Sequence, residues 1–299
     1  MQAAADFKRL ARNVYSQNGE DGILEWLFSK IAPESRICVE FGAWDGRRLS
    51  NTFNLVAHQG WKGIYIEGDR SKFEALTKTS TELPQITPIL RFVSTSGPDS
   101  LDNILRGMQI PENFALLSID VDGNDYEIWE GMKNFRPSVV IIEHNPSFHP
   151  GFEYVDHGGR AFMGSSATSL YLLARRKGYE LLGCSTINLF FVRQELFAAL
   201  DVRPQTVHEI FDNSELCHVF TNYAGELVFS NPAIRRKLRA VSYVSRSKTL
   251  SRRLAHVPTY YVLDEHRAKE NAVFRLFRRL IAVCITLFGT SSHDHERIS

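Results

Sequence analysis

The stretch Ile37-Cys-Val-Glu-Phe-Gly-Ala-Trp-Asp-Gly46 is an apolar strand that contains Glu40 and runs directly into a turn with two glycines. Further along, a second apolar stretch, Gly63-Ile-Tyr-Ile66, is followed by Glu67. Parallel α/β sheets bind nucleotide-like ligands at the carboxyl ends of their strands, where an acid closing the second strand can accept both hydroxyls of a ribose. These two stretches therefore predict a parallel sheet and a ligand with an adenosine-like ribose.

The glycine spacing discriminates between ribose-containing ligands. A dinucleotide fingerprint reads G-x-G-x-x-G and directs backbone amides at a pyrophosphate. Here the turn has only Gly42 and Gly46, and it carries Glu40 and Asp45. Two carboxylates would repel a pyrophosphate but would attract an ammonium and a sulfonium. The pattern favours S-adenosylmethionine over NAD, and the sequence has no P-loop; the alternative is that the glycines only close a tight turn.

Apolar runs and helical periodicity alternate over the first two thirds of the chain. A capped amphipathic helix follows residues 16–21, and then strands are expected at 36–41, 62–67, 86–93, 114–121 and 138–143. Helices are expected between them at 47–59, 70–80, 98–107 and 125–133, and later near 166–177. A hairpin of 179–182 and 188–192 would close one edge of the sheet. The sequence thus predicts a doubly wound, Rossmann-like α/β methyltransferase sheet of about seven strands with an antiparallel last strand.

Composition bounds the class and setting of the protein. The 299 residues are 43% hydrophobic and 23% charged, which is ordinary for a globular chain. With 35 basic and 34 acidic residues, no overall field attracts nucleic acid, so no nucleic-acid partner is expected. The first residues lack the apolar core of a signal peptide, and the four cysteines are scattered, which favours a reducing, cytoplasmic location.

The regular pattern ends near residue 200. We therefore expect a methyltransferase domain at 1–200 and a mainly helical extension at 201–299 with basic, amphipathic helices. The apolar run 280–288 follows several arginines and is too short to span a bilayer, which takes about 20 residues. It would lie peripherally on an anionic membrane, mediate self-association or dock on a partner; the alternative is packing against its own domain.

Two neighbouring strands are expected to end in chemically useful side chains. Strand alternation places Asp120 and Asp122 on one side, and Glu143, His144 and Asn145 close the next strand. Such oxygen-rich strand ends suit a hard divalent cation such as Mg²⁺, held by Asp120, Glu143 and Asn145, with His144 as general base. The alternatives are metal-free base catalysis by His144 or Asp120, and, for Asp125, a helix cap.

Several blocks of this sequence, in order, resemble the FkbM-like group of S-adenosylmethionine-dependent methyltransferases, in particular its branch with a YSQNGEDG opening. The blocks are Tyr15-Ser-Gln-Asn-Gly-Glu-Asp-Gly22, Val39-Glu-Phe-Gly-Ala-Trp-Asp-Gly46 with Ser50-Asn-Thr52, Gly60-Trp-Lys-Gly-Ile-Tyr-Ile-Glu67, Leu117-Ser-Ile-Asp-Val-Asp-Gly-Asn-Asp-Tyr126 and Ile142-Glu-His-Asn-Pro146. The resemblance covers roughly 14–200 and does not extend to 201–299.

The resemblance implies O-methylation of a hydroxyl on a sugar, glycan or natural product. It implies that Glu40, Gly42 and Asp45 contact the methionine part of the cofactor, that Glu67 holds the ribose, and that Asp120 lies beside the transferring methyl. Gly46 and Asn51 belong to the same expected cofactor site. A rival hypothesis is a catalytically silent methyltransferase-fold protein that binds a nucleotide or a partner, and a weaker one is an NAD-linked enzyme.

Overall fold

The computed structural model describes residues 2–121, 123–158, 164–212, 219–221 and 227–229. The chain divides into two compact units, Met1–Phe211 and Asp212–Ser299. In the second unit, β8 (Val219–Thr221) and β9 (Leu227–Phe229) form an antiparallel pair. The apolar run 280–288 and the arginines before it, like Asp122, lie outside the described residues.

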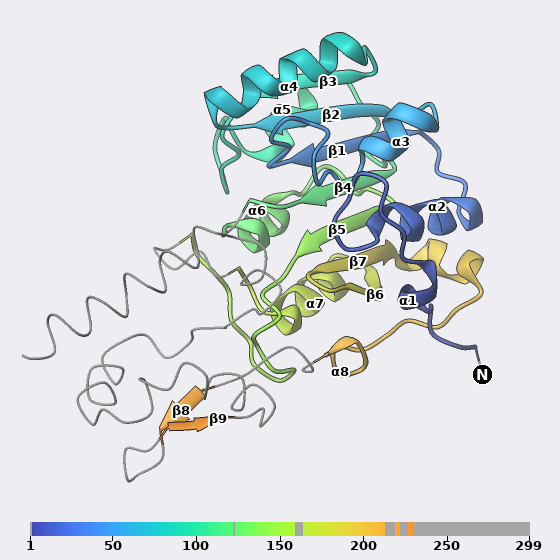
Figure 1. Cartoon of the computed structure of the whole chain (residues 1–299), viewed down its shortest axis with the longest axis vertical. Coiled ribbons are helices and arrows are strands. Elements are labelled where there is room, and N and C mark those ends of the chain that lie inside the picture. Colours follow the sequence, from blue (N-terminus) through green and yellow to red (C-terminus); the bar gives the residue numbers. More distant parts are fainter. Residues whose placement is uncertain (1, 122, 159–163, 213–218, 222–226, 230–299) are drawn as a thin grey trace, which may run out of the picture. The chain divides into compact units, whose positions relative to one another are not determined.

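A single seven-stranded sheet organises the first unit, in the order β3-β2-β1-β4-β5-β7-β6 (Figure 1). Its strands are β1 (Ile37–Phe41), β2 (Lys62–Glu67), β3 (Ile86–Leu90), β4 (Leu116–Ile119), β5 (Val139–Glu143), β6 (Tyr179–Ser185) and β7 (Asn188–Arg193). The first five strands are parallel, whereas β7 pairs antiparallel with both β5 and β6. The predicted sheet, its closing hairpin and its antiparallel last strand are therefore confirmed.

Helices cover both faces of this sheet. The core on one face packs against α5 (Leu101–Arg106), α6 (Asp125–Gly131) and α7 (Ala167–Arg176), and the core on the other face packs against α2 (Glu20–Lys30), α3 (Phe53–His58) and α4 (Arg70–Glu82). Three short elements, α1 (Phe7–Leu10), η1 (Gln194–Leu200) and α8 (Val207–Ile210), complete the unit. Burial on both faces explains why the strands read as nearly continuous apolar runs.

The helix expected at 47–59 begins only at Phe53. Residues 47–52 instead form a loop, because their polar groups bind the side chains of Glu40 and Asp45. Leu49 has a φ of 60°, which a helix does not allow. The expected strands 86–93 and 114–121 were also too long, since β3 ends at Leu90 and β4 at Ile119.

The Tyr15–Gly22 block forms a network of polar contacts at the start of α2. Asp21 Oδ2 accepts the backbone N–H groups of residues 14, 15 and 16, each at 2.8 Å. The neighbouring Glu20 is fully buried, and its Oε1 accepts hydrogen bonds from Ser185 Oγ and Asn188 Nδ2 at 2.7 and 2.9 Å. Asp21 thus fixes the backbone that precedes α2, and Glu20 fastens the helix to the β6–β7 hairpin.

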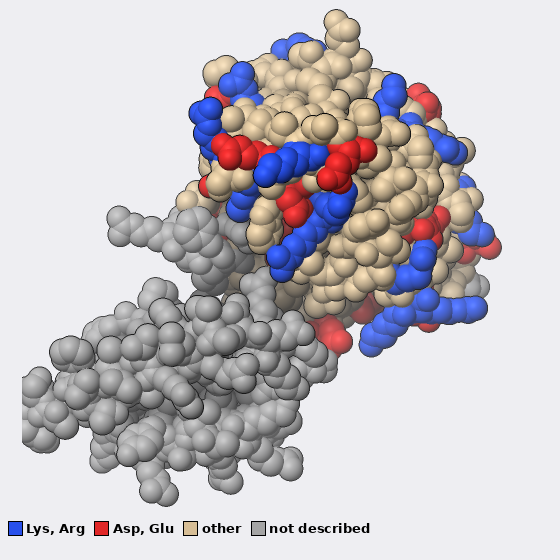
Figure 2. Space-filling model, turned by 45° about the horizontal axis from the view of Figure 1, so that its top comes forward, with Lys and Arg blue, Asp and Glu red and all other residues tan. Residues whose placement is uncertain are grey.

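The surface carries charges of both signs. Lys and Arg side chains lie among Asp and Glu side chains on the face shown in Figure 2, as the formal net charge of +1 leads one to expect. Within the described part of the chain, no helix combines the length and apolar character that crossing a bilayer requires.

Candidate active site

The turn after β1 lies directly against the end of β4. Gly42 has a φ of 76°, and a Cβ at this position would lie 1.8 Å from the carbonyl oxygen of Asp120. Glycine is required here both for the left-handed backbone and for the close approach. This contact brings the β1 turn and Asp120 together at the carboxyl edge of the sheet, as predicted.

Glu40 holds the loop that follows this turn. Its Oε2 accepts hydrogen bonds from Ser50 Oγ at 2.7 Å and from the hydroxyl and backbone N–H of Thr52, and its Oε1 accepts from the N–H of Asn51 at 3.2 Å. Burial raises the pKa of Glu40, and the nearby charge of Asp120 raises it further, against the opposing effect of these hydrogen bonds. Glu40 is therefore an anchoring residue of this loop, and its contact with a cofactor stays a prediction.

Asn51 lies within this anchored loop and is 5% exposed. Its Nδ2 donates to Ser118 Oγ on β4 at 3.1 Å. In the sheet register Ser118 is opposite Glu40, so the bond links the loop to the strand that leads to Asp120. Asn51 thus lies at the predicted edge, and its contact with a cofactor stays a prediction.

Glu67 closes β2 and points to the same face of the sheet as Glu40, because Tyr65, two residues earlier, is the register partner of Glu40. Its Oε2 accepts the N–H of Trp44 and its Oε1 accepts the N–H of Asp69, both at 2.8 Å. Each carboxylate oxygen has two acceptor positions, so one position per oxygen remains after these bonds. Two acceptors side by side are what the vicinal hydroxyls of a ribose require.

The remaining predicted residues of the β1 turn have structural contacts. Asp45 Oδ1 accepts the N–H groups of Arg47 and Arg48 at 3.0 and 2.8 Å and so fixes the turn. Gly46 has a φ of 71°, and a Cβ there would lie 2.4 Å from Leu76 Cδ1 of α4. Both residues shape the turn, while their contact with a cofactor stays a prediction.

Asp120 is partly buried and follows the last residue of β4. Its charge raises the pKa of both Glu40 and Asp125, which places negative charges close together at this edge. Asp125 begins α6 and accepts the N–H groups of Val121 and Gly123 at 3.0 and 2.9 Å. Burial, foremost, raises the pKa of Asp125 to about 6. Asp125 thus anchors the β4–α6 turn. Its interpretation as a helix cap is wrong, because Asn124 is the N-cap residue of α6 and the N–H groups that Asp125 accepts precede the helix.

The end of β5 supplies Glu143, His144 and Asn145. Ile119 pairs with Ile142 in the register, so Asp120 and Glu143 leave the sheet on adjacent strands. His144 is 6% exposed, and its Nδ1 donates to the carbonyl of Ile187 at 2.6 Å. Burial lowers the pKa of His144 to about 4, so the imidazole is neutral near pH 7. With the proton on Nδ1, its Nε2 is a hydrogen-bond acceptor.

The residues at this edge do not make a convincing cation site. Asn145 Oδ1 accepts the backbone N–H and the hydroxyl of Ser147 at 2.9 and 2.5 Å, which occupies both of its acceptor positions. Among the described residues, no three His, Cys, Asp or Glu side chains gather as metal ligands. A divalent cation bound by Asp120, Glu143 and Asn145 stays a prediction.

One exposed aromatic residue of this edge was missed from the sequence. Phe92 is 77% exposed just beyond β3, and its ring lies 2.9 Å from the position of a Cβ on Gly68, the residue after Glu67. Phe92 was missed because it was included in the strand expected at 86–93. An aromatic residue just after a parallel strand can indicate a ligand-binding edge. Trp44 is 42% exposed in the neighbouring turn, with the cationic ends of Arg48 and Lys72 over its ring.

The strand order and the antiparallel β7 define the class of this chain: it has the Rossmann-like fold of S-adenosylmethionine-dependent methyltransferases. Solved structures of low similarity include the CMeT domain of the citrinin polyketide synthase (TM-score 0.42, 14% identity, 60% of this chain and 55% of that chain). Two others are the N-terminal domain of EvdMO1 in the presence of SAH and D-fucose (0.40, 13%, 61% and 84%) and a SAM-dependent methyltransferase from Aquifex aeolicus (0.36, 9%, 56% and 86%).

The chain thus covers 55% of the length of the citrinin synthase domain. No protein-family model matches the sequence, and no curated protein matches it either. Membership of the FkbM-like group therefore stays a prediction.

Proposed function

We propose that this chain is an S-adenosylmethionine-dependent O-methyltransferase of the FkbM-like kind, acting on a hydroxyl of a sugar, glycan or natural-product acceptor. The observation that carries the proposal is the arrangement of Glu67. This carboxylate is fixed by two backbone N–H groups and keeps two acceptor positions at the edge where the β1 turn meets Asp120.

The charge of the site supports a cationic cofactor. Glu40 and Asp120 lie near enough for each negative charge to disfavour the other, which helps to raise the pKa of Glu40. A ligand with an ammonium and a sulfonium would relieve this repulsion, whereas a pyrophosphate would increase it. The site therefore favours S-adenosylmethionine over NAD on electrostatic grounds. Phe92, which lies against Gly68, and Trp44, whose N–H binds Glu67, offer exposed aromatic surfaces for the adenine.

Methyl transfer requires an in-line approach of the acceptor oxygen and removal of its proton. Of the two predicted catalytic residues, we assign the base to Asp120, which lies at the edge where Gly42 approaches the end of β4. His144 has a pKa of about 4, so it binds a proton only weakly near neutral pH. We assign to His144 the role of accepting a hydrogen bond through Nε2 and so orienting the acceptor hydroxyl.

Calorimetry with the full chain tests the cofactor. S-adenosylmethionine and S-adenosylhomocysteine should bind, and NAD should not. Glu67→Ala should weaken binding at least about tenfold, since a hydrogen bond to a charged group contributes about 1.5–3 kcal/mol. Glu74→Ala, which removes an exposed acid of α4, is the matched control and should leave binding unchanged. Absence of binding by both sulfur compounds would overturn the proposal.

Turnover separates the enzyme from a silent binding protein. Release of S-adenosylhomocysteine should be followed with a panel of sugar and glycan acceptors in the presence and absence of a chelator. Asp120→Asn should abolish turnover, whereas cofactor binding should weaken but persist, because one negative charge of the site is lost. Binding without turnover on any acceptor would instead support the catalytically silent alternative, and loss of turnover on chelation would restore the magnesium hypothesis.

A further inference from the structure

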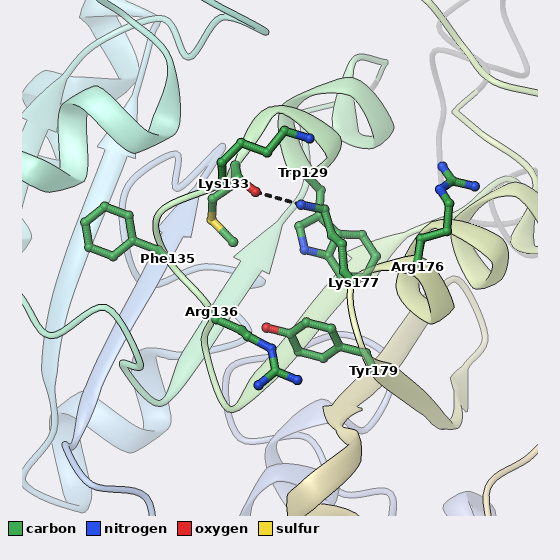
Figure 3. Close-up of a pocket in the computed structure, with 8 residues that line it drawn as sticks. Trp129, Lys133, Phe135, Arg136, Arg176, Lys177 and Tyr179 are labelled. Carbon is green, nitrogen blue, oxygen red and sulfur yellow. Dashed lines mark hydrogen bonds between the residues drawn. The ribbon is translucent and has the colours of Figure 1, made fainter.

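A separate pocket of about 300 Å³ lies at the opposite, amino-terminal edge of the sheet (Figure 3). It forms where α6 and α7 end and where β5 and β6 begin. The pocket is lined by Trp129, Met132, Lys133, Phe135, Arg136, Arg176, Lys177 and Tyr179. Four of these side chains are basic and none is acidic, although the chain as a whole has a net charge of only +1.

Neighbouring acids neutralise only part of this positive charge. Arg136 forms two hydrogen bonds with the carboxylate of Glu195, at 2.5 and 3.0 Å, and Arg176 lies 3.3 Å from Glu130. In the described part of the chain, neither Lys133 nor Lys177 forms an ion pair within 4.0 Å. The pocket therefore keeps an excess of positive charge from these two lysines, which the nearby carboxylate of Asp102 offsets in part.

Lys177 is held in place although its charge is disfavoured. Its Nζ donates to the carbonyl of Met132 at 2.6 Å, the bond drawn in Figure 3. Burial, and then the charge of Lys133, lower the pKa of Lys177 to about 8. Arg176 acts in the same direction, whereas Asp102 and Glu130 oppose it. A bound anion would remove this strain on the charged lysine.

One residue of the pocket lining carries a buried donor without an acceptor. Trp129 is fully buried, and among the described residues its Nε1 has no hydrogen-bond partner. A buried N–H without an acceptor is costly and rare in folded proteins. The indole stands at 5.7 Å from the ring of Tyr179 in an edge-to-face arrangement, and Phe135 and Met132 extend the apolar wall. The pocket thus combines donors and cations with an apolar surface.

We propose that this pocket binds a small phosphate monoester, with its phosphate between Lys133 and Lys177, its oxygen accepting from Trp129 Nε1, and its organic part against the aromatic wall. A phosphate monoester has a charge of about −1.5 to −2 at pH 7, so it can pair with both lysines at once. A carboxylate would neutralise only one of them. The site is independent of the proposed methyl transfer, because it lies at the other edge of the sheet.

Nuclear magnetic resonance of the full chain tests the donor. The indole N–H signal of Trp129, identified by its absence in Trp129→Phe, should move downfield on titration with phenyl phosphate at constant ionic strength. The other three tryptophans should be unaffected. Benzoate has the same ring and one negative charge, and should cause a smaller change at equal concentration. An unmoved Trp129 signal, or equal binding of benzoate, would overturn the proposal.

Calorimetry with phenyl phosphate tests the cations. Lys177→Met keeps most of the aliphatic side chain and should weaken binding about tenfold or more, as loss of a charged hydrogen bond predicts. Lys78→Met removes an exposed lysine of α4 and should have no effect. Binding at pH 8.5 should take up protons, because a phosphate next to Lys177 raises its pKa. If Lys133→Met and Lys177→Met both bind as the wild type does, the cations only stabilise the helix ends and the proposal fails.

Discussion

Acidification should destabilise this fold through His144. The residue is 6% exposed, and a histidine in an unfolded chain titrates near 6.5, whereas burial lowers the pKa of His144 to about 4. As the pH falls through 6.5, His144 binds a proton in the unfolded chain but not in the folded chain. The free energy of unfolding therefore decreases from pH 6.5 downward until His144 is itself protonated near pH 4.

The magnitude follows from the two pKa values. They differ by about 2.5, and one pKa unit corresponds to about 1.36 kcal/mol, so the full effect is about 3 kcal/mol. That is a large part of the about 5–15 kcal/mol by which folded domains are stable. Asp125 acts in the opposite sense over the same range, since its pKa is raised to about 6. The wild type alone would hide both effects, and a comparison with a variant is needed.

Urea denaturation of the wild type and His144→Asn at pH 7 and pH 4 makes this comparison. Asparagine can still donate to the carbonyl of Ile187 but does not titrate. Relative to the wild type, the variant should gain about 3 kcal/mol of stability between the two pH values. Replacing the exposed His58 by asparagine is the control and should produce no such gain. If His144→Asn follows the wild type at both pH values, the side chain is solvated and our account of it is wrong.

Three further outcomes are expected. Asp125→Asn should show the reverse dependence, gaining about 3 kcal/mol on the wild type as the pH rises from 4 to 6.5, because burial disfavours the ionised carboxylate; urea titrations at both pH values check this. Gly42→Ala should lose about 2 kcal/mol or more of stability, together with cofactor binding, since its Cβ would collide with the Asp120 carbonyl; unchanged calorimetry would count against this contact. Asp21→Ala should cost about 2 kcal/mol in urea unfolding, because three backbone N–H groups lose their acceptor, and an unaltered midpoint would contradict that role.

The sheet could be predicted because its signals are local. Runs such as Val139–Glu143 are apolar throughout, and the spacing of the last two strands indicates a hairpin, so strand identity follows from the sequence. Helix boundaries were less accurate where polar residues serve a distant partner. Residues 47–52 were expected to begin a helix, but the carboxylate of Glu40 holds the polar residues Ser50 and Thr52 in another conformation.

The site was predictable in position more than in detail. Strand ends gave Glu67 and Asp120, while the buried hydrogen bonds that make Glu40 an anchor depend on a loop whose path the sequence does not show. The basic pocket could not be predicted at all. Lys133 and Lys177 come from the ends of different helices, and only the packing of α6 beside α7 brings them to one cavity.

Under the proposed function, the hydrogen bonds at the start of α2 limit how an acceptor can enter the site. Glu20 accepts hydrogen bonds from Ser185 and Asn188, and Asn188 pairs with Glu143 in the sheet. These contacts hold α2 beside Glu143, at the edge of the sheet where the proposed function places the reaction. Displacement of α2 would leave the buried carboxylate of Glu20 without its hydrogen-bond donors, which costs free energy. Under the proposed function, an acceptor should therefore reach the site without any displacement of α2.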